Sequence, residues 1–244
     1  MATLSALASS DLARQFDALA ATWDAEHGPA SVRAPEFAAR VRCLRAHCRE
    51  LGRPRVLDLG CATGWTLLAL SDLISAGTGV DVAPAMIEQG RRNSRTLPVR
   101  FQVGDAVEFC SRSEEQFDLV LLIGVLAHLP DPRAALAGIK RVLAMEGRLV
   151  VITPHPWGPA VRLRHSLVER RATPPVRHLS PLGLGTLAMR HGLELSALAG
   201  LPYAPWPRLR AFCRRCTAQA GVFRRNPLTG LVCGAYAAVL QHSR

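Results

Sequence analysis

The chain has 244 residues, of which 49% are hydrophobic and 20% are charged, so it has enough apolar side chains for a core and does not have the composition of a disordered or collagen-like protein. Its uncharged apolar stretches are shorter than the roughly 20 residues that cross a bilayer, and it does not open on a basic segment followed by an apolar run. The net charge is +11, and the whole basic excess falls after residue 150, where the acidic residues are Glu169 and Glu194.

Two amphipathic helices are expected before the first strand. The first is expected to begin at a cap near Asp11 and to carry Phe16, Leu19 and Trp23 on one face, at helical spacing. The second spans residues 35–51. Both patterns predict helices that bury one side against a core.

Short apolar runs and helical stretches then alternate along the chain. The runs expected to form strands are residues 56–59, 77–82, 99–103, 117–123 and 148–153. The helical stretches between them are residues 65–74, 85–93, 106–110 and 133–143. Strand alternating with helix is typical of βαβ units, so the pattern predicts a parallel sheet.

The remaining third of the chain predicts further helices and two more strands. We expect a helix near residues 160–171, a second helix over 181–191 behind a Ser180 cap, and a strand over 193–198. A basic amphipathic stretch follows at 208–225, and a last strand at 233–240. No linker separates this part, so it is expected to belong to the same domain.

The most informative segment is residues 56–65, Val-Leu-Asp-Leu-Gly-Cys-Ala-Thr-Gly-Trp, which predicts a buried strand, a glycine-rich turn and a helix. A ligand can approach the backbone closely at such a turn. Asp81 ends the next strand and is placed to accept hydrogen bonds from ribose hydroxyls. Asp105 follows the third strand on the same edge of the sheet. The three features together predict a nucleoside-type ligand.

Two other nucleotide sites fit this segment poorly. A dinucleotide site needs a small residue where Trp65 stands, because the helix must pack closely against the strand there. A phosphate-binding loop needs a Gly-Lys-Ser/Thr sequence, which the turn lacks.

These motifs resemble those of the class I S-adenosylmethionine-dependent methyltransferases, over roughly residues 55–154. The matching segments are residues 56–64, 79–81, 104–106, 117–132 and 147–151. Ala62 departs from the family pattern, which usually has a glycine there. The loop Leu-Ala-His-Leu-Pro-Asp-Pro at 126–132 resembles the ubiquinone-biosynthesis and natural-product type, which methylates small molecules.

The resemblance implies a Rossmann-like α/β fold in one domain. We expect a seven-stranded, mostly parallel sheet with an antiparallel last strand and helices on both faces. Residues 1–53 would form a helical lid, 54–154 the cofactor-binding core, and 155–244 the substrate-cap helices and last strands.

The resemblance also implies roles in binding S-adenosylmethionine. Gly60 and Gly64 would lie against its methionine part, Asp58 near its amino group, Asp81 on the ribose and Asp105 at the adenine amino group. The neighbouring residues expected to line the same site are Cys61, Ala62, Val82 and Ala106. An alternative for Asp58 and Asp105 is that they only cap the turns that follow them.

Methyl transfer from a sulfonium is an in-line displacement, so the protein mainly supplies alignment and, where needed, a base. His128 follows the fourth strand, and its imidazole titrates near neutral pH. His155 is the second candidate base. The alternative for His128 is a contact with the loop backbone before Pro130. The residues expected to bind the substrate are Phe16, Trp23, Trp157, His178 and Tyr203.

We expect the methyl acceptor to be a hydroxyl group of a hydrophobic or aromatic metabolite, quinone-like or a natural product. One alternative is a nucleic-acid methyltransferase, since arginines bind phosphates nonspecifically. Those enzymes usually have Asn/Asp-Pro-Pro-Tyr/Phe where this chain has Ile-Gly-Val-Leu at 123–126. Another alternative is a partner subunit that binds S-adenosylmethionine without catalysis.

The seven cysteines are irregularly spaced, unlike the disulfide framework of a secreted domain, so we expect reduced thiols and a cytoplasmic protein. Cys213 and Cys216 have no second pair at matching spacing, and no metal site is predicted. Residues 208–225 could cover the sheet with solvated arginines, or lie on an anionic membrane surface.

Overall fold

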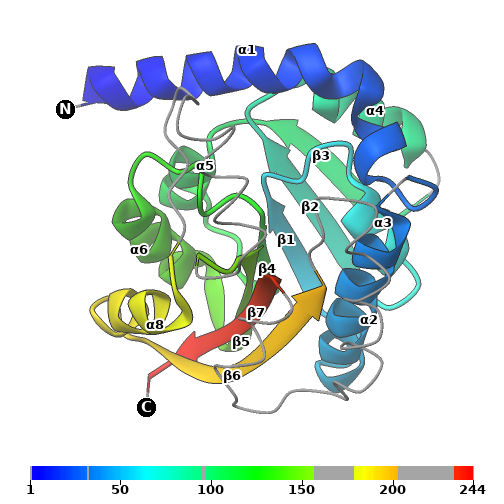
Figure 1. The fold of residues 1–244 in the computed structure, drawn as a ribbon. Helices are drawn as coiled ribbons and strands as arrows, with labels where there is room; N and C mark the ends of the chain where they lie inside the picture. The colour runs from blue at the N-terminus through cyan, green and yellow to red at the C-terminus, as the bar shows by residue number, and fades with distance from the viewer. Residues whose placement is uncertain (1, 32, 95–96, 157–178, 203–233, 244) are drawn as a thin grey trace.

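The computed structural model describes residues 2–31, 33–94, 97–156, 179–202 and 234–243. Within these ranges the helices are α1 (Ala2–His27), α2 (Ala34–Glu50), α3 (Trp65–Leu70), α4 (Pro84–Asn93), α5 (Ala106–Arg112), α6 (Pro132–Val142) and α8 (Pro181–Met189). The strands are β1 (Arg55–Leu59), β2 (Ala76–Asp81), β3 (Val99–Val103), β4 (Phe117–Ile123), β5 (Leu143–Pro154), β6 (Leu193–Pro202) and β7 (Gly234–His242) (Figure 1).

The strands form one seven-stranded sheet in the order β3-β2-β1-β4-β5-β7-β6. The strands β1 to β5 pair in parallel, whereas β7 is antiparallel to both β5 and β6. This confirms the predicted sheet with its antiparallel last strand. The strand order reverses between β1 and β4, and ligands of such sheets bind beyond the carboxyl ends of the strands at that position.

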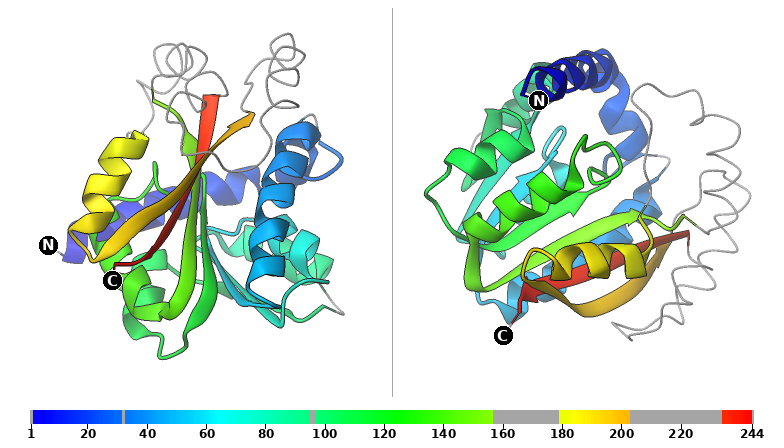
Figure 2. Two further views of the ribbon diagram at one scale, coloured as in Figure 1. Left: turned by 90° about the horizontal axis from the view of Figure 1, so that it is seen from below. Right: turned by 90° about the vertical axis from the view of Figure 1, so that its left-hand side faces the viewer.

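Helices cover both faces of the sheet (Figure 2). On one face, apolar side chains of α5, α6 and α8 pack against the sheet, including Leu136 and Leu184. On the other face, α2, α3 and α4 contribute residues such as Leu44, Leu67 and Ile87. The central strands are apolar on both faces because both are covered.

Helix α1 lies across the carboxyl end of the parallel strands, since it contacts the segments that follow β1, β2 and β4. It begins at Ala2, so the predicted cap near Asp11 is wrong; the alanines and leucines that precede Asp11 favour helix. The side chain of Leu19 is 41% exposed, contrary to the predicted stripe, because the helix docks through the neighbouring face.

Several other boundaries differ from the predicted ones. Helix α3 ends at Leu70 instead of residue 74, and β5 begins at Leu143 instead of residue 148. The predicted Ser180 cap is confirmed: its hydroxyl accepts a hydrogen bond from the Gly183 N–H, 3.1 Å away. The helices expected near 160–171 and 208–225 lie outside the described residues. None of the described helices is long and apolar enough to cross a membrane.

Candidate functional site

The glycine-rich turn after β1 has a left-handed backbone at three positions. The φ angles are +72° at Gly60, +48° at Ala62 and +78° at Gly64. A Cβ at Gly60 would lie 2.2 Å from Val125, and one at Gly64 would lie 2.3 Å from the Phe101 ring. Both glycines are therefore required by conformation and by space. Ala62 accepts the left-handed conformation at a cost of about 1–2 kcal/mol.

Asp81 joins the turn after β1 to the start of α4. One of its carboxylate oxygens accepts a hydrogen bond from the Ala62 N–H at 2.9 Å, and the other accepts one from the Ala83 N–H at 3.0 Å. Burial raises its pKa, and these two N–H groups oppose the shift. Each carboxylate oxygen has a second lone pair, so Asp81 can still accept from ribose hydroxyls.

Asp58 is a buried carboxyl next to Asp81, with an exposed fraction of 2%. Its pKa is raised to about 7, mainly by burial and also by the charge of Asp81, while Arg40 opposes the shift. Among the described residues, none donates a hydrogen bond to the Asp58 side chain, so the alternative that it caps a turn is not observed there. A buried carboxylate of this kind is costly unless a cation pairs with it. The position therefore fits the amino group of a bound methionine moiety.

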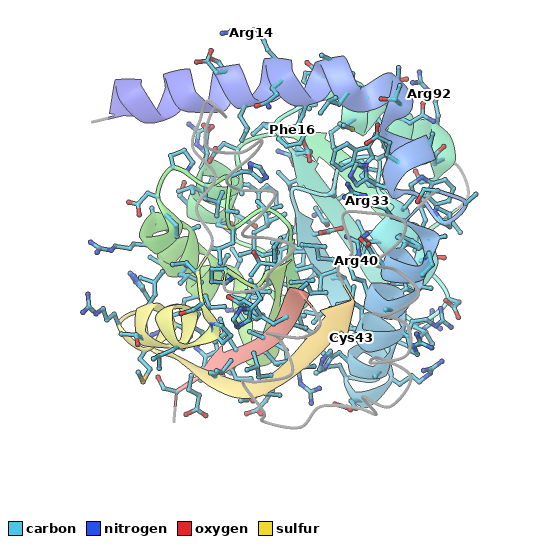
Figure 3. All side chains as sticks on the ribbon, viewed as in Figure 1. Arg14, Phe16, Arg33, Arg40, Cys43 and Arg92 are labelled. Carbon is cyan, nitrogen blue, oxygen red and sulfur yellow. The ribbon has the colours of Figure 1, made fainter. Side chains whose placement is uncertain are left out.

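Arg40 of α2 is a site residue that the sequence analysis missed. Its half-buried guanidinium lies 5.8 Å from the centroid of the Phe37 ring and close enough to Asp58 to lower that pKa (Figure 3). Burial lowers the pKa of Arg40 itself. No described carboxylate forms an ion pair with it within 4.0 Å. A charged residue on the apolar face of α2 was the available sequence signal.

Asp105 is the N-cap of α5. Its side chain accepts hydrogen bonds from the N–H groups of Val107 at 2.8 Å and Glu108 at 3.1 Å. The capping alternative is therefore the observed role within the described residues. A carboxylate can accept more than two hydrogen bonds, so the expected contact with the adenine amino group stays a prediction.

His128 lies in the loop between β4 and α6, against the aromatic side of α1. Its ring packs edge-to-face on Phe16, with the centroids 5.7 Å apart, and Phe16 packs in the same manner on Trp23 at 5.9 Å. Trp23 stacks on His27 at 3.9 Å, and burial lowers the pKa of His27 to about 4. The structure therefore brings together three of the predicted site residues, from segments far apart in the chain.

His155, the second candidate base, is 2% exposed at the end of β5. Its ring packs on that of Tyr236 in β7, with the centroids 5.7 Å apart, and burial lowers its pKa. An acceptor has poor access to this imidazole. Three other predicted residues lie outside the described residues: Trp157, His178 and Tyr203.

The remaining predicted residues are placed around the turn. Cys61 is buried, and its Sγ lies 2.8 Å from where a Cβ of Gly79 would be, so it packs on β2. Val82 follows β2, and Ala106 begins α5; both are half-buried. Contact of these two residues with a cofactor stays a prediction.

Comparisons with known proteins find similar methyltransferases. A family model described as a methyltransferase domain matches residues 57–151. The ubiquinone biosynthesis O-methyltransferase of Xanthomonas axonopodis pv. citri is 27% identical over 201 residues, covering 79% of this chain and 84% of the relative. The corresponding protein of Xanthomonas campestris pv. campestris (strain B100) is 28% identical over 208 residues, with the same coverage.

Among solved structures, the CcbJ methyltransferase from Streptomyces caelestis superposes with a TM-score of 0.65 at 17% identity, covering 93% of this chain and 96% of that chain. A DhpI–SAH complex gives a TM-score of 0.64 at 19% identity, covering 96% and 97%. At these identities the structural matches show the fold.

Proposed function

We propose that this chain, which is a class I S-adenosylmethionine-dependent methyltransferase, transfers the methyl group to a hydroxyl of a small hydrophobic or aromatic molecule. The observation that carries the proposal is the contact of the His128 imidazole with Phe16, at the carboxyl end of β4. It puts a potential base beside an aromatic surface. The curated relatives are named as O-methyltransferases of ubiquinone biosynthesis, which supports an oxygen acceptor of quinone type.

The cofactor would lie along the carboxyl ends of β1, β2 and β3. Asp58 and Arg40 offer opposite charges for the amino and carboxylate groups of its methionine part, while Gly60 and Gly64 let the backbone approach closely. Asp81 would accept from the ribose hydroxyls. When bound, the cofactor supplies a methyl group on a positively charged sulfur.

His128 would take the proton from the acceptor hydroxyl. A phenolic hydroxyl has a pKa near 10 and is mostly protonated at neutral pH, so an imidazole within hydrogen-bond reach assists its attack. Phe16 and Trp23 would pack on the acceptor ring, exclude water and align the hydroxyl. His155 is the weaker candidate because its ring is buried against Tyr236.

Three parts of the chain would have different roles in binding the cofactor and the methyl acceptor. We infer that residues 1–53 form a lid, 54–154 the cofactor-binding core, and 155–244 the substrate cap. The contacts of α1 with the segments after β1, β2 and β4 support the role of the first part.

The test is a panel of small acceptors with S-adenosylmethionine, read by product mass. Catechols and hydroquinones should gain one methyl group on oxygen, whereas matched anilines and O-methylated phenols should remain unchanged. The Asp81→Ala variant is the control for turnover that depends on the cofactor site. Methylation of RNA or of the anilines, with no turnover of the hydroxyl compounds, would contradict the proposal.

A further inference from the structure

Helix α1 carries two pairs of residues at a spacing of seven. Phe16 and Trp23 form one pair, and Asp17 and Asp24 form the other. Seven residues are almost two helical turns, so each pair lies along one line of the helix, and the two lines are about 100° apart around its axis. The aromatic line reaches His128, whereas the acidic line reaches the other side of the site.

The acidic line is anchored at two points of the cofactor site. Asp24 accepts a hydrogen bond from the Thr63 hydroxyl at 2.6 Å, and Thr63 is only 1% exposed in the middle of the glycine-rich turn. Asp17 accepts a hydrogen bond from the Ala85 N–H at 2.8 Å, in the first turn of α4. Both segments also flank Asp81, whose carboxylate binds the N–H groups of Ala62 and Ala83.

We propose that Asp17 and Asp24 are positioning residues that couple the docking of α1 to occupation of the cofactor site. Both hydrogen bonds exist only when α1 is docked. They form only when the glycine-rich turn and the start of α4 hold the positions in which Asp81 accepts its two N–H hydrogen bonds. A ligand bound to Asp81 would stabilise the same positions. By linkage, a ligand that favours this geometry favours docking, and docking favours the ligand to the same extent.

The coupling also determines at which step the surface for the methyl acceptor forms, namely Phe16 and Trp23 against His128. Phe16 and Trp23 belong to the same rigid helix, so docking through Asp17 and Asp24 places the aromatic line against His128. The cofactor would therefore bind first and the acceptor second. This last step rests on the proposed function, whereas the coupling of α1 to the cofactor site does not.

The first experiment measures the affinity for S-adenosylhomocysteine by calorimetry in Asp24→Ala, Thr63→Val and the double variant. Each single change removes the same charge-assisted hydrogen bond and should weaken binding by about 5- to 20-fold. The double variant should bind S-adenosylhomocysteine as tightly as the single variant with the lower affinity, because the two side chains form one hydrogen bond. Asp24→Asn keeps an acceptor oxygen and should retain most of the affinity.

Asp11→Ala is the matched control, because Asp11 lies on the same helix and pairs with Arg14, which points away from the sheet (Figure 3). Its affinity should equal that of the wild type. Asp17→Ala should resemble Asp24→Ala, since it removes the bond to Ala85.

The second experiment measures amide hydrogen exchange of residues 10–27 with and without S-adenosylhomocysteine. The ligand should slow exchange of α1 by at least about threefold in the wild type, and less in Asp24→Ala. Affinity within twofold of the wild type in Asp24→Ala, losses that add in the double variant, or exchange that the ligand leaves unchanged would each overturn the coupling. No readout uses an acceptor, so failure of hydroxyl methylation alone leaves this result standing.

Discussion

The side chain of Val125 fills the space that a side chain at Gly60 would need, with its Cγ2 2.2 Å from the position of a Cβ. Gly60 follows β1 and Val125 follows β4, so the contact spans the point where the strand order reverses. The Val125 carbonyl also accepts the His128 N–H at 2.8 Å. The cofactor turn and the loop of the proposed base are thus packed against each other.

Gly60→Ala should therefore destabilise the protein by more than the backbone strain accounts for, because the new methyl group also clashes with Val125. Gly52→Ala is the matched control, because Gly52 has a similar φ of +66° with nothing within 4 Å of a Cβ. We expect the control to lose about 1–2 kcal/mol of unfolding free energy and Gly60→Ala about 1–3 kcal/mol more. Urea unfolding measures both losses. Adding Val125→Ala to Gly60→Ala should recover part of the difference between the two glycine variants, because it removes the methyl groups that clash. Equal losses at the two glycines would refute the clash.

Asp58 should make the stability of the ligand-free protein depend on pH. Its pKa is raised from 3.8 to about 7 in the folded state, so between these values the folded protein holds a proton that the unfolded chain releases. Its stabilising contribution is full below about pH 4 and is lost as the pH rises through about 7, by up to about 4 kcal/mol. Urea unfolding of Asp58→Asn should lack this component. An unchanged pH profile in that variant would assign the dependence to other groups.

Asp81→Ala should weaken the binding of S-adenosylhomocysteine by about 1.5–3 kcal/mol, through loss of charged hydrogen bonds. The variant also releases the N–H groups of Ala62 and Ala83, so Asp81→Asn, which keeps one acceptor oxygen, should lose less. Calorimetry of the two variants beside the wild type measures the difference. Wild-type affinity in Asp81→Ala would remove this residue from the cofactor site.

His128→Ala should lower kcat by about 10²- to 10⁴-fold on a hydroxyl acceptor and leave the affinity for S-adenosylhomocysteine within about threefold. His128→Asn should be equally slow if the imidazole moves a proton, and nearly active if it only donates a positioning hydrogen bond. The kcat of His128→Asn relative to that of His128→Ala separates these cases. Full activity of both variants from pH 6 to 9 would exclude His128 as the base.

Local patterns were enough to predict the strands β1 to β5 and the turn after β1, because each depends on residues adjacent in the chain. The left-handed positions at Gly60 and Gly64 are examples, since glycine adopts them at no steric cost. Ser180 is another, because a cap acts within its own helix.

The docking of α1 could not be predicted in the same way. The hydrogen bond between Asp24 and Thr63 joins residues 39 positions apart, and acidic residues on an amphipathic helix normally face solvent. Arg40 was missed for a similar reason, because Asp58, whose pKa it lowers, becomes its neighbour only when α2 packs on the sheet. Sequence spacing indicates which residues share a face but not what that face meets.

The position of β7 between β5 and β6 has a consequence for synthesis of the protein. Residues 235–240 are all buried, and β6 is an edge strand of the described sheet whose hydrogen-bonded neighbour is β7. The ribosome completes β6 before it reaches residue 234, so for that interval β5 and β6 each present an unpaired edge. Such edges recruit strands from other chains. A charge at the buried Val239 should therefore hinder the insertion of β7 between these edges and shift newly made protein from the soluble to the aggregated fraction.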